Sequence, residues 1–367
     1  MARGIPRRAG LFEPTLIAAA AQILFLDVPD HAAVDLAVEA VKREPAAAPF
    51  ASLANGVLRN LAREGQNAIL NADPLDDETP AWLAERWRAH YGEATARAIA
   101  AANRCEATLD VTLKAPDEGW AERLNAESLP TGSLRLLTHA PIVSLPGYDD
   151  GAWWVQDAAA ALPARLLRPE PAKRILDLCA APGGKTAQLA AAGADVTAVD
   201  RSAERLDRLR ANLGRLKLPA DLRLGDVAEF ASEPFDMVLL DAPCTATGTI
   251  RRHPDVAWGK RPGDVAELAA LQSRMLDRAA ALVRPGGELV YCVCSLEPQE
   301  GEAQIAALLA RNAELRRVPI DPSEIAGLSE CLTSDGDLRT LPCHLWRGEP
   351  RRSGLDGFYS ARLARLR

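Results

Sequence analysis

From residue 174 onward, short apolar segments alternate with amphipathic ones. Residues 175–178 and 235–240 are nearly continuous apolar runs, as in strands that are buried on both faces. Residues 203–216 instead carry leucine at helical spacing. Further strands are predicted at 196–199, 222–224 and 288–294, helices at 186–192, 265–283 and 304–310, and late strands at 343–346 and 357–364. The alternation predicts an α/β fold with a doubly wound, mostly parallel, Rossmann-like sheet.

Residues 1–72 show only the helical period, so they predict an all-α module. Its apolar stripes comprise Leu16, Ala20, Ile23 and Leu24; Val34, Ala37, Val38 and Val41; and Leu53, Val57, Leu58 and Leu61. Pro29 and Pro45 mark the breaks between the predicted helices.

Residues 73–146 mix both periods and predict a linker followed by a small α+β segment. The acidic, proline-containing stretch 73–80 is the linker, and Trp82, Leu83 and Trp87 lie on the apolar side of a predicted helix. The predicted pieces are a helix at 81–103, a strand at 107–113, a short helix at 119–125 and extended segments at 134–137 and 141–145. The α/β domain then occupies residues 147–367.

Composition narrows the class of protein. The chain has 367 residues, 25% of them charged and 48% hydrophobic, which is typical of globular proteins. The 43 basic and 50 acidic residues leave a net charge of −7, so binding of duplex DNA through the overall field is disfavoured. An odd count of 7 cysteines favours reduced thiols in a cytoplasm. The apolar stretch 16–26 is too short for a membrane span, and a secretory signal is disfavoured.

The loop after the first predicted strand of the α/β domain is rich in glycine. Gly183 and Gly184 let the backbone approach a ligand closely, and Lys185 follows them. The dinucleotide pattern G-x-G-x-x-G is absent, and Cys179 occupies the place of the first P-loop glycine. The loop therefore predicts a ligand other than a phosphate cradled by a P-loop, with a plain tight turn as the alternative.

Acidic residues and thiols follow the other strands of the predicted sheet. Asp200, Asp226 and Asp241 end three strands, where carboxylates bind ribose hydroxyls, although each could instead cap a helix. Cys244 and Cys294 follow two neighbouring strands and suggest nucleophilic chemistry. The alternatives are buried structural cysteines or half of a zinc site, but no C-x-x-C or histidine pair is near in sequence.

Taken together, these runs resemble one known family. They are LDLCAAPGGKT (176–186), AVDR (198–201), LLDAPCTATG (239–248), IRRHPD (250–255), LVY (289–291), CS (294–295) and GF (357–358). The set resembles the S-adenosylmethionine-dependent RNA cytosine-5 methyltransferases of the Nop/Sun family, most closely the bacterial Sun/Fmu type that acts on small-subunit (16S) rRNA. Residues 29–41 and 53–58 resemble the back half of its NusB-like RNA-binding domain. The chain departs from the pattern at Val293, usually threonine, at Cys292, commonly alanine or serine, and in having fewer N-terminal helices.

The resemblance assigns roles to residues of the predicted site. It implies that Cys294 attacks carbon 6 of cytosine, that Cys244 assists release, that Asp241 contacts the N3 edge, and that Lys185 orients the site and lowers the thiolate pKa. On chemistry alone, Cys244 in its Pro-Cys pair is a rival nucleophile. The resemblance implies a cofactor pocket for S-adenosylmethionine lined by Cys179, Ala180, Ala181, Pro182, Gly183, Gly184, Lys185, Asp200, Arg205, Asp226 and Asp241.

The expected partner is RNA, and the resemblance implies 16S rRNA, either naked or in a small-subunit assembly intermediate. Arg251, Arg252 and His253 follow the Cys244 loop and are predicted to hold phosphates, with a solvated loop as the alternative. A monomer without metal or membrane attachment is expected. The alternative functions are a tRNA-directed enzyme of the same chemistry and a non-catalytic NusB-like RNA-binding or antitermination protein.

Overall fold

The N-terminal unit is a small helical module. The computed structural model describes residues 6, 8–26, 28–116, 119–138 and 140–367, which form two compact units at residues 1–78 and 79–367. The first unit contains α1 (Phe12–Phe25), α2 (Asp30–Arg43) and α3 (Ala51–Asn71), with a 3-10 turn at Ala48–Phe50 before α3. Phe12, Leu16, Val34, Val41 and Leu58 form its core. The predicted all-α module is therefore confirmed.

One of the three predicted apolar stripes, the one on α3, includes a residue that is not buried. Leu53 was expected to face the core, but it is 38% exposed, and Ala54 is buried instead. The buried face of α3 is therefore displaced by one residue at its N-terminal end, where small Ala54 permits close helix packing.

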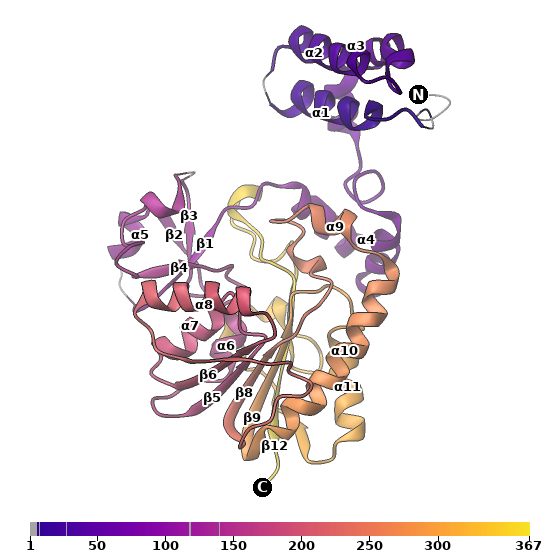
Figure 1. Ribbon diagram of the computed structural model, residues 1–367. Helices are drawn as coiled ribbons and strands as arrows, with labels where there is room; N and C mark the ends of the chain where they lie inside the picture. The colour runs from indigo at the N-terminus through magenta and orange to yellow at the C-terminus, as the bar shows by residue number, and fades with distance from the viewer. Residues whose placement is uncertain (1–5, 7, 27, 117–118, 139) are drawn as a thin grey trace. The chain divides into compact units, whose positions relative to one another are not determined.

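The second unit is built on a large twisted sheet (Figure 1). Its strand order is β10-β12-β9-β8-β5-β6-β7, and β11 pairs with β12. The strands are β5 (Arg174–Leu178), β6 (Asp195–Asp200), β7 (Asp221–Leu224), β8 (Phe235–Asp241), β9 (Val283–Val293), β10 (Leu315–Arg317), β11 (Leu338–Thr340) and β12 (Phe358–Arg365). The run from β7 to β9 is parallel, whereas β12 is antiparallel to β9 and β10. The predicted mostly parallel Rossmann-like sheet is confirmed.

Helices cover both faces of this sheet, as Figure 1 shows. The helices are α6 (Leu162–Leu166), α7 (Gly184–Ala191), α8 (Ala203–Leu216), α9 (Asp255–Gly259), α10 (Pro262–Ala281) and α11 (Glu302–Arg311). Neighbouring residues of β5 point to opposite cores: Ile175 packs with α6 and α7, and Leu176 packs with α10. This arrangement explains why the parallel strands are apolar without alternation.

A second, smaller sheet and helix α4 (Ala81–Arg104) also belong to this unit. The sheet is antiparallel in the order β2-β3-β1-β4. Its strands are β1 (Asp110–Leu113), β2 (Ala126–Ser128), β3 (Leu134–Leu136) and β4 (Trp153–Val155), and α5 (Gly119–Arg123) lies beside it. The small α+β segment was thus predicted in outline, but no break between compact units falls at residue 146.

Two predicted extended segments are wrong. Residues 141–145 contain a 3-10 turn at Ile142–Ser144, and residues 343–346 form a turn in which His344 N donates to Leu341 O at 2.9 Å. Pro342 within that turn has no N–H to offer a neighbouring strand. The strand that does pair in this region is β11, which the sequence pattern did not reveal.

The described residues contain neither a membrane-spanning helix nor a cluster of metal-ligating side chains. No helix in that part of the chain is both long and apolar enough to cross a membrane. Within the same residues, no group of three or more His, Cys, Asp or Glu side chains is arranged to hold a metal ion.

Candidate active site

The glycine loop joins β5 to α7 at the carboxyl edge of the sheet. Gly183 has a φ of +107°, and a Cβ there would lie 2.2 Å from Leu209 Cδ1, so only glycine fits. Ala181 N donates to Asp200 Oδ2 at 3.2 Å, and Lys185 in the first turn of α7 is buried. The loop is therefore fixed to the neighbouring strand.

The acidic residues of β6 and β7 occupy different environments. Asp200 is buried, and its carboxylate also accepts from Ser202 N at 3.1 Å and lies 3.4 Å from Arg205 Nη2. Ser202, rather than Asp200, caps α8, so the helix-cap alternative does not describe Asp200. Asp226 is exposed, and its Oδ1 accepts from Ala228 N at 2.9 Å. Gly225 N donates to Asp200 O at 3.1 Å, so the ends of β6 and β7 lie side by side.

A lysine and a carboxylate pair at the centre of this edge. Lys185 Nζ donates to Asp241 Oδ2 at 2.8 Å, and it lies 5.1 Å from the centre of the Phe358 ring. Burial, the largest single effect, would lower the pKa of Lys185, but the charge and hydrogen bond of Asp241 and the charges of Cys292 and Cys294 together raise that pKa above its ordinary value. Lys185 is therefore a fixed cation. Sequence reasoning noted Phe358 only as part of a matching run.

The two candidate thiols lie side by side. Cys244 Sγ is 3.4 Å from Cys294 Sγ, because β8 and β9 are parallel neighbours that end together. The hydrogen bond with Cys294, then burial, then the charge of Cys294 raise the pKa of Cys244 well above its ordinary value. These effects favour the protonated thiol form of Cys244.

Two further cysteines border the site without the features of a nucleophile. Cys292 is fully buried and donates to Asp241 Oδ1 at 3.4 Å; burial and Asp241 raise its pKa. Burial, then Asp241 and other acids, likewise raise the pKa of Cys179. A thiol held in the protonated form is a weak nucleophile.

Close backbone contacts fix the Cys244 loop, residues 242–248, which follows β8. Gly248 N donates to Cys294 O at 3.0 Å, and Gly357 N donates to Gly248 O at 2.7 Å. A Cβ on Gly248 would lie 1.8 Å from Gly357 O, so no other residue fits. The segment before β12 is thus part of the site's framework.

Two family models match the chain, each within a different unit. Residues 164–364, more than half of the chain, match the family described as 16S rRNA methyltransferase RsmB/F. The chain belongs to this methyltransferase family. Residues 2–63 match the NusB family, which confirms the resemblance of the N-terminal module.

Individual relatives agree with this family. A protein of Shewanella oneidensis named ribosomal RNA small subunit methyltransferase B is 35% identical and aligns with 99% of the chain and 84% of its own length. A Klebsiella pneumoniae protein of the same name is 40% identical over 83% of the chain and 75% of its own length. A solved methyltransferase homolog from Pyrococcus horikoshii is 27% identical over 78% of the chain and 95% of its own, with a TM-score of 0.65. The structure titled PH0851 has a TM-score of 0.77 at 24% identity, covers 96% of the chain and 82% of its own, and shows the shared fold.

Two of the predicted phosphate-binding residues of this RsmB/F chain are held internally. Arg251 has a side chain only 2% exposed, and its Nη2 lies 3.1 Å from Asp157 Oδ2 and 3.8 Å from Asp356 Oδ1. Arg252 Nε donates to both oxygens of Asp356 at 3.0 and 2.9 Å. This geometry does not support either arginine as a phosphate ligand, because carboxylates already occupy both guanidinium groups. His253 is exposed.

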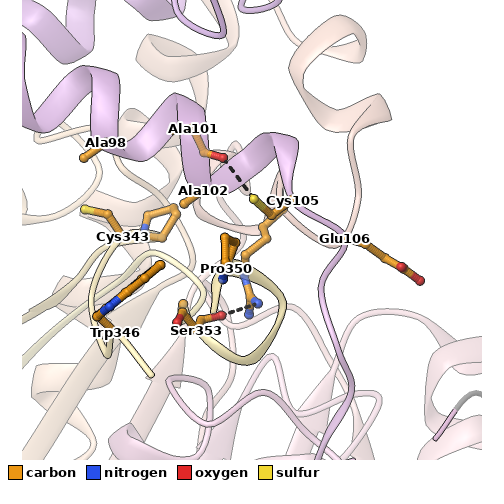
Figure 2. A pocket seen from close by; sticks show the side chains of 12 residues that line it. Ala98, Ala101, Ala102, Cys105, Glu106, Cys343, Trp346, Pro350 and Ser353 are labelled. Atoms are coloured by element: carbon orange, nitrogen blue, oxygen red, sulfur yellow. Dashed lines mark hydrogen bonds between the residues drawn. The ribbon is translucent and has the colours of Figure 1, made fainter. Parts of the chain in front are cut away.

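Arg251 is one of the residues that line a cavity of about 400 Å³. Figure 2 shows this cavity from close by. The end of α4 and residues 342–354 line it, and Trp346 is 65% exposed at its wall. Cys105 Sγ donates to Ala101 O at 3.4 Å within the same wall. None of the thiols or carboxylates of the candidate active site lines this cavity. It is therefore separate from that site.

A pH-dependent contribution to stability is expected from Asp177 of β5. Its Oδ2 accepts from Thr186 Oγ1 at 2.6 Å, and burial raises its pKa from an ordinary 3.8 to about 7. The folded chain therefore binds this proton more tightly than the unfolded chain, so the contribution falls as pH rises from about 4 to about 7. Asp177→Asn should remove that fall, and urea unfolding of both proteins at pH 5 and pH 8 would measure it. Parallel pH profiles for the two proteins would contradict the shift.

Proposed function

We propose that this chain transfers a methyl group from S-adenosylmethionine to carbon 5 of a cytosine in 16S rRNA, through a covalent bond between Cys294 and carbon 6 of that base. The observation that carries the proposal is the pair of thiols, 3.4 Å apart, beside the Lys185–Asp241 ion pair. Carbon 5 of cytosine is a poor nucleophile. Addition of a thiolate to carbon 6 makes carbon 5 enamine-like, and a base must later remove its proton. Two thiols at one site meet both needs.

The protonation of Cys244 supports a division of roles between the thiols. A thiolate at Cys294 would oppose ionisation of Cys244 through its hydrogen bond and charge, in addition to burial, and this fits an attack by Cys294. Once Cys294 is bonded to carbon 6, it carries no charge, and this opposition to ionisation of Cys244 ends. Cys244 can then ionise and take the proton from carbon 5. The electrons of that C–H bond re-form the double bond between carbons 5 and 6 and expel the Cys294 thiolate.

Asp241 and Lys185 are proposed to bind the reacting base. Addition to carbon 6 places negative charge on the N3 and O2 side of the ring, where a proton donor stabilises it. Lys185 stays protonated and donates to Asp241 Oδ2 at 2.8 Å, so a hydrogen bond from Asp241 to N3 requires a proton on the Asp241 carboxyl group. The expected effect of Lys185 on the Cys294 thiolate remains a prediction.

The residues at the strand ends fit S-adenosylmethionine by their chemistry. Three carboxylates lie at the carboxyl edge of the large sheet, those of Asp200, Asp226 and Asp241. Their negative charge favours a cationic ligand with hydroxyl groups over an anionic dinucleotide. When bound, S-adenosylmethionine supplies an electrophilic methyl group on a positively charged sulfur. Asp200 would accept hydrogen bonds from ribose hydroxyls, and residues 179–185 and Arg205 would shape the pocket around it.

The RNA substrate is proposed from the relatives, whose names state ribosomal RNA small subunit methyltransferase activity. The target cytosine must leave its stack to reach Cys294, so single-stranded or flipped RNA is the expected form. His253, exposed beside the Cys244 loop, is the predicted phosphate contact that this structure leaves accessible. We further propose that the chain acts as a cytoplasmic monomer; sedimentation would test its oligomeric state.

Methyl transfer to defined RNAs tests the proposed function. The purified chain is incubated with tritiated S-adenosylmethionine and with 16S rRNA or total tRNA from a strain that lacks the gene. We expect label in 16S rRNA at one cytosine, identified as 5-methylcytosine after nuclease digestion and chromatography. Label in tRNA alone would overturn the rRNA assignment, and label on a different atom would overturn the cytosine-5 chemistry.

Asp200→Ala should weaken binding of S-adenosylmethionine by about 1–3 kcal/mol, because a charge-assisted hydrogen bond is lost. Calorimetric titration measures this affinity. Asp195→Ala is the matched control, since Asp195 is exposed at the opposite end of the same strand, β6. Equal affinities for the wild type and Asp200→Ala would remove Asp200 from the proposed pocket.

A further inference from the structure

A buried carboxylate joins the two loops that carry the thiols. Glu300 is 0% exposed, and Thr245 N donates to its Oε1 at 2.9 Å. Its Oε2 accepts from Ser295 Oγ at 2.5 Å and from Thr245 Oγ1. Thr245 directly follows Cys244, and Ser295 directly follows Cys294. One side chain therefore contacts the residue next to each thiol.

The remaining contacts of Glu300 reinforce the same two loops. Gln272 Nε2 of α10 donates to Glu300 Oε1 at 3.1 Å and to Pro243 O at 2.9 Å. Tyr291 OH of β9 donates to the backbone oxygen of Glu300 at 2.5 Å. Within the described part of the chain, no Lys, Arg or His side chain forms an ion pair with Glu300. Its charge is thus held by neutral donors alone.

An ordinary structural role does not account for these contacts. Burying a carboxylate away from cations is costly, so hydrogen bonds must compensate. Glu300 lies just before α11, but its carboxylate accepts from the thiol loops rather than from the first amides of that helix. Glu297 provides the contrast, since it is equally buried but forms an ion pair with Arg86 of α4.

We propose that Glu300 is a positioning residue that sets the separation of Cys244 and Cys294 by bridging Thr245 and Ser295. The catalytic meaning of that separation rests on the proposed function, whereas the separation itself does not. The charge of Glu300 also raises the pKa of Cys244. Its effect comes after those of the hydrogen bond with Cys294, burial and the charge of Cys294. Glu300 thus adds to the effects that favour the protonated form of Cys244.

Three variants separate the bridge from its charge. Glu300→Asp is one methylene shorter, so it cannot reach both loops. Glu300→Gln keeps the length: its oxygen can face Thr245 N and Gln272, while its amide donates to the two hydroxyls. Thr245→Val removes one hydroxyl donor with little change of volume. Glu297→Gln is the matched control, because it neutralises a buried glutamate of the same segment that does not bridge the loops.

The rate of disulfide formation between Cys244 and Cys294 reports how well the two sulfur atoms are placed, and the measurement needs neither RNA nor cofactor. Diamide takes two electrons and two protons from Cys244 and Cys294, is reduced to its hydrazine, and leaves a disulfide that peptide mass spectrometry quantifies. We expect Glu300→Asp to form this disulfide about tenfold more slowly than the wild type, and Thr245→Val to lie between them. Glu300→Gln and Glu297→Gln should stay within about twofold. Wild-type rates in both Glu300→Asp and Thr245→Val would overturn the proposal.

Methyl transfer supplies the second measurement. Glu300→Asp should lower kcat about 100-fold, as a small misplacement of reacting groups does, while KM for S-adenosylmethionine stays within about twofold. Glu300→Gln should recover most of that loss, which a general loss of folding would not produce. A KM effect without a kcat effect would contradict positioning. If the wild type methylates no cytosine, the proposed function fails, and the oxidation rates still decide the role of Glu300.

Discussion

Cys294→Ala is expected to reduce methyl transfer by about 10⁴-fold or more and to form no covalent complex with RNA. The expectation follows because the variant lacks the sulfur that adds to carbon 6, and without that bond carbon 5 does not become nucleophilic. Transfer of tritiated methyl groups measures the loss, and denaturing electrophoresis of protein with labelled RNA shows whether an adduct forms.

Cys244→Ala should give the opposite pattern. Cys294 still adds to the base and the methyl group is still transferred, but the base that removes the proton from carbon 5 is missing. The protein–RNA adduct should therefore accumulate and survive denaturation, while turnover stops after about one cycle. An adduct in Cys294→Ala but not in Cys244→Ala would reverse the two roles.

Cys292 is the control for both experiments. In an extended strand it points to the same side as Cys294, but it is fully buried and bound to Asp241. Any residual transfer in Cys294→Ala should be unchanged in the double variant with Cys292→Ala. A further drop in the double variant would show that Cys292 can replace the nucleophile.

Arg251→Ala is expected to destabilise the second unit by about 3–5 kcal/mol, because it leaves the buried Asp157 without its ion-pair partner and removes one of the two cations beside Asp356. The empty volume adds to the existing cavity of about 400 Å³ rather than being filled by neighbours, which increases the cost. Urea unfolding followed by tryptophan fluorescence measures the change.

Arg316→Ala is the matched control for this loss. Arg316 is exposed on β10 of the same unit, and its removal should change stability by no more than about 0.5 kcal/mol. RNA binding of Arg251→Ala, measured where it is still folded, should show the wild-type dependence on salt. A stable variant with a shallower salt dependence would restore Arg251 as a phosphate ligand.

The parts of the site that local pattern predicts are those at the strand ends. A glycine loop, an aspartate or a cysteine directly after an apolar strand is visible along the chain, and parallel strands bring their carboxyl ends together. That rule predicts that Cys244 and Cys294 lie near each other at the ends of neighbouring strands, as the structure shows.

The parts that local pattern missed depend on segments far apart in the sequence. Arg251 was expected at the surface because a charged loop residue usually is, but its partners are Asp157 and Asp356, roughly a hundred residues away on either side. Glu300 gave no signal for the same reason, since its bridge to Thr245 exists only once β8 and β9 are paired. The turn at 343–346 was mistaken for a strand because a short apolar run does not distinguish the two.

The position of β12 affects the order in which the protein becomes active during synthesis. This strand is the last of the large sheet to leave the ribosome, yet it lies between β9 and β10. Gly357 and Phe358 at its start contact Gly248 and face Lys185. A nascent chain that ends before residue 357 can already contain the complete glycine loop and both thiols, but the Cys244 loop lacks the backbone against which it rests. Cofactor binding is therefore expected to precede catalytic competence as the chain emerges, and the last strand to be made completes the enzyme.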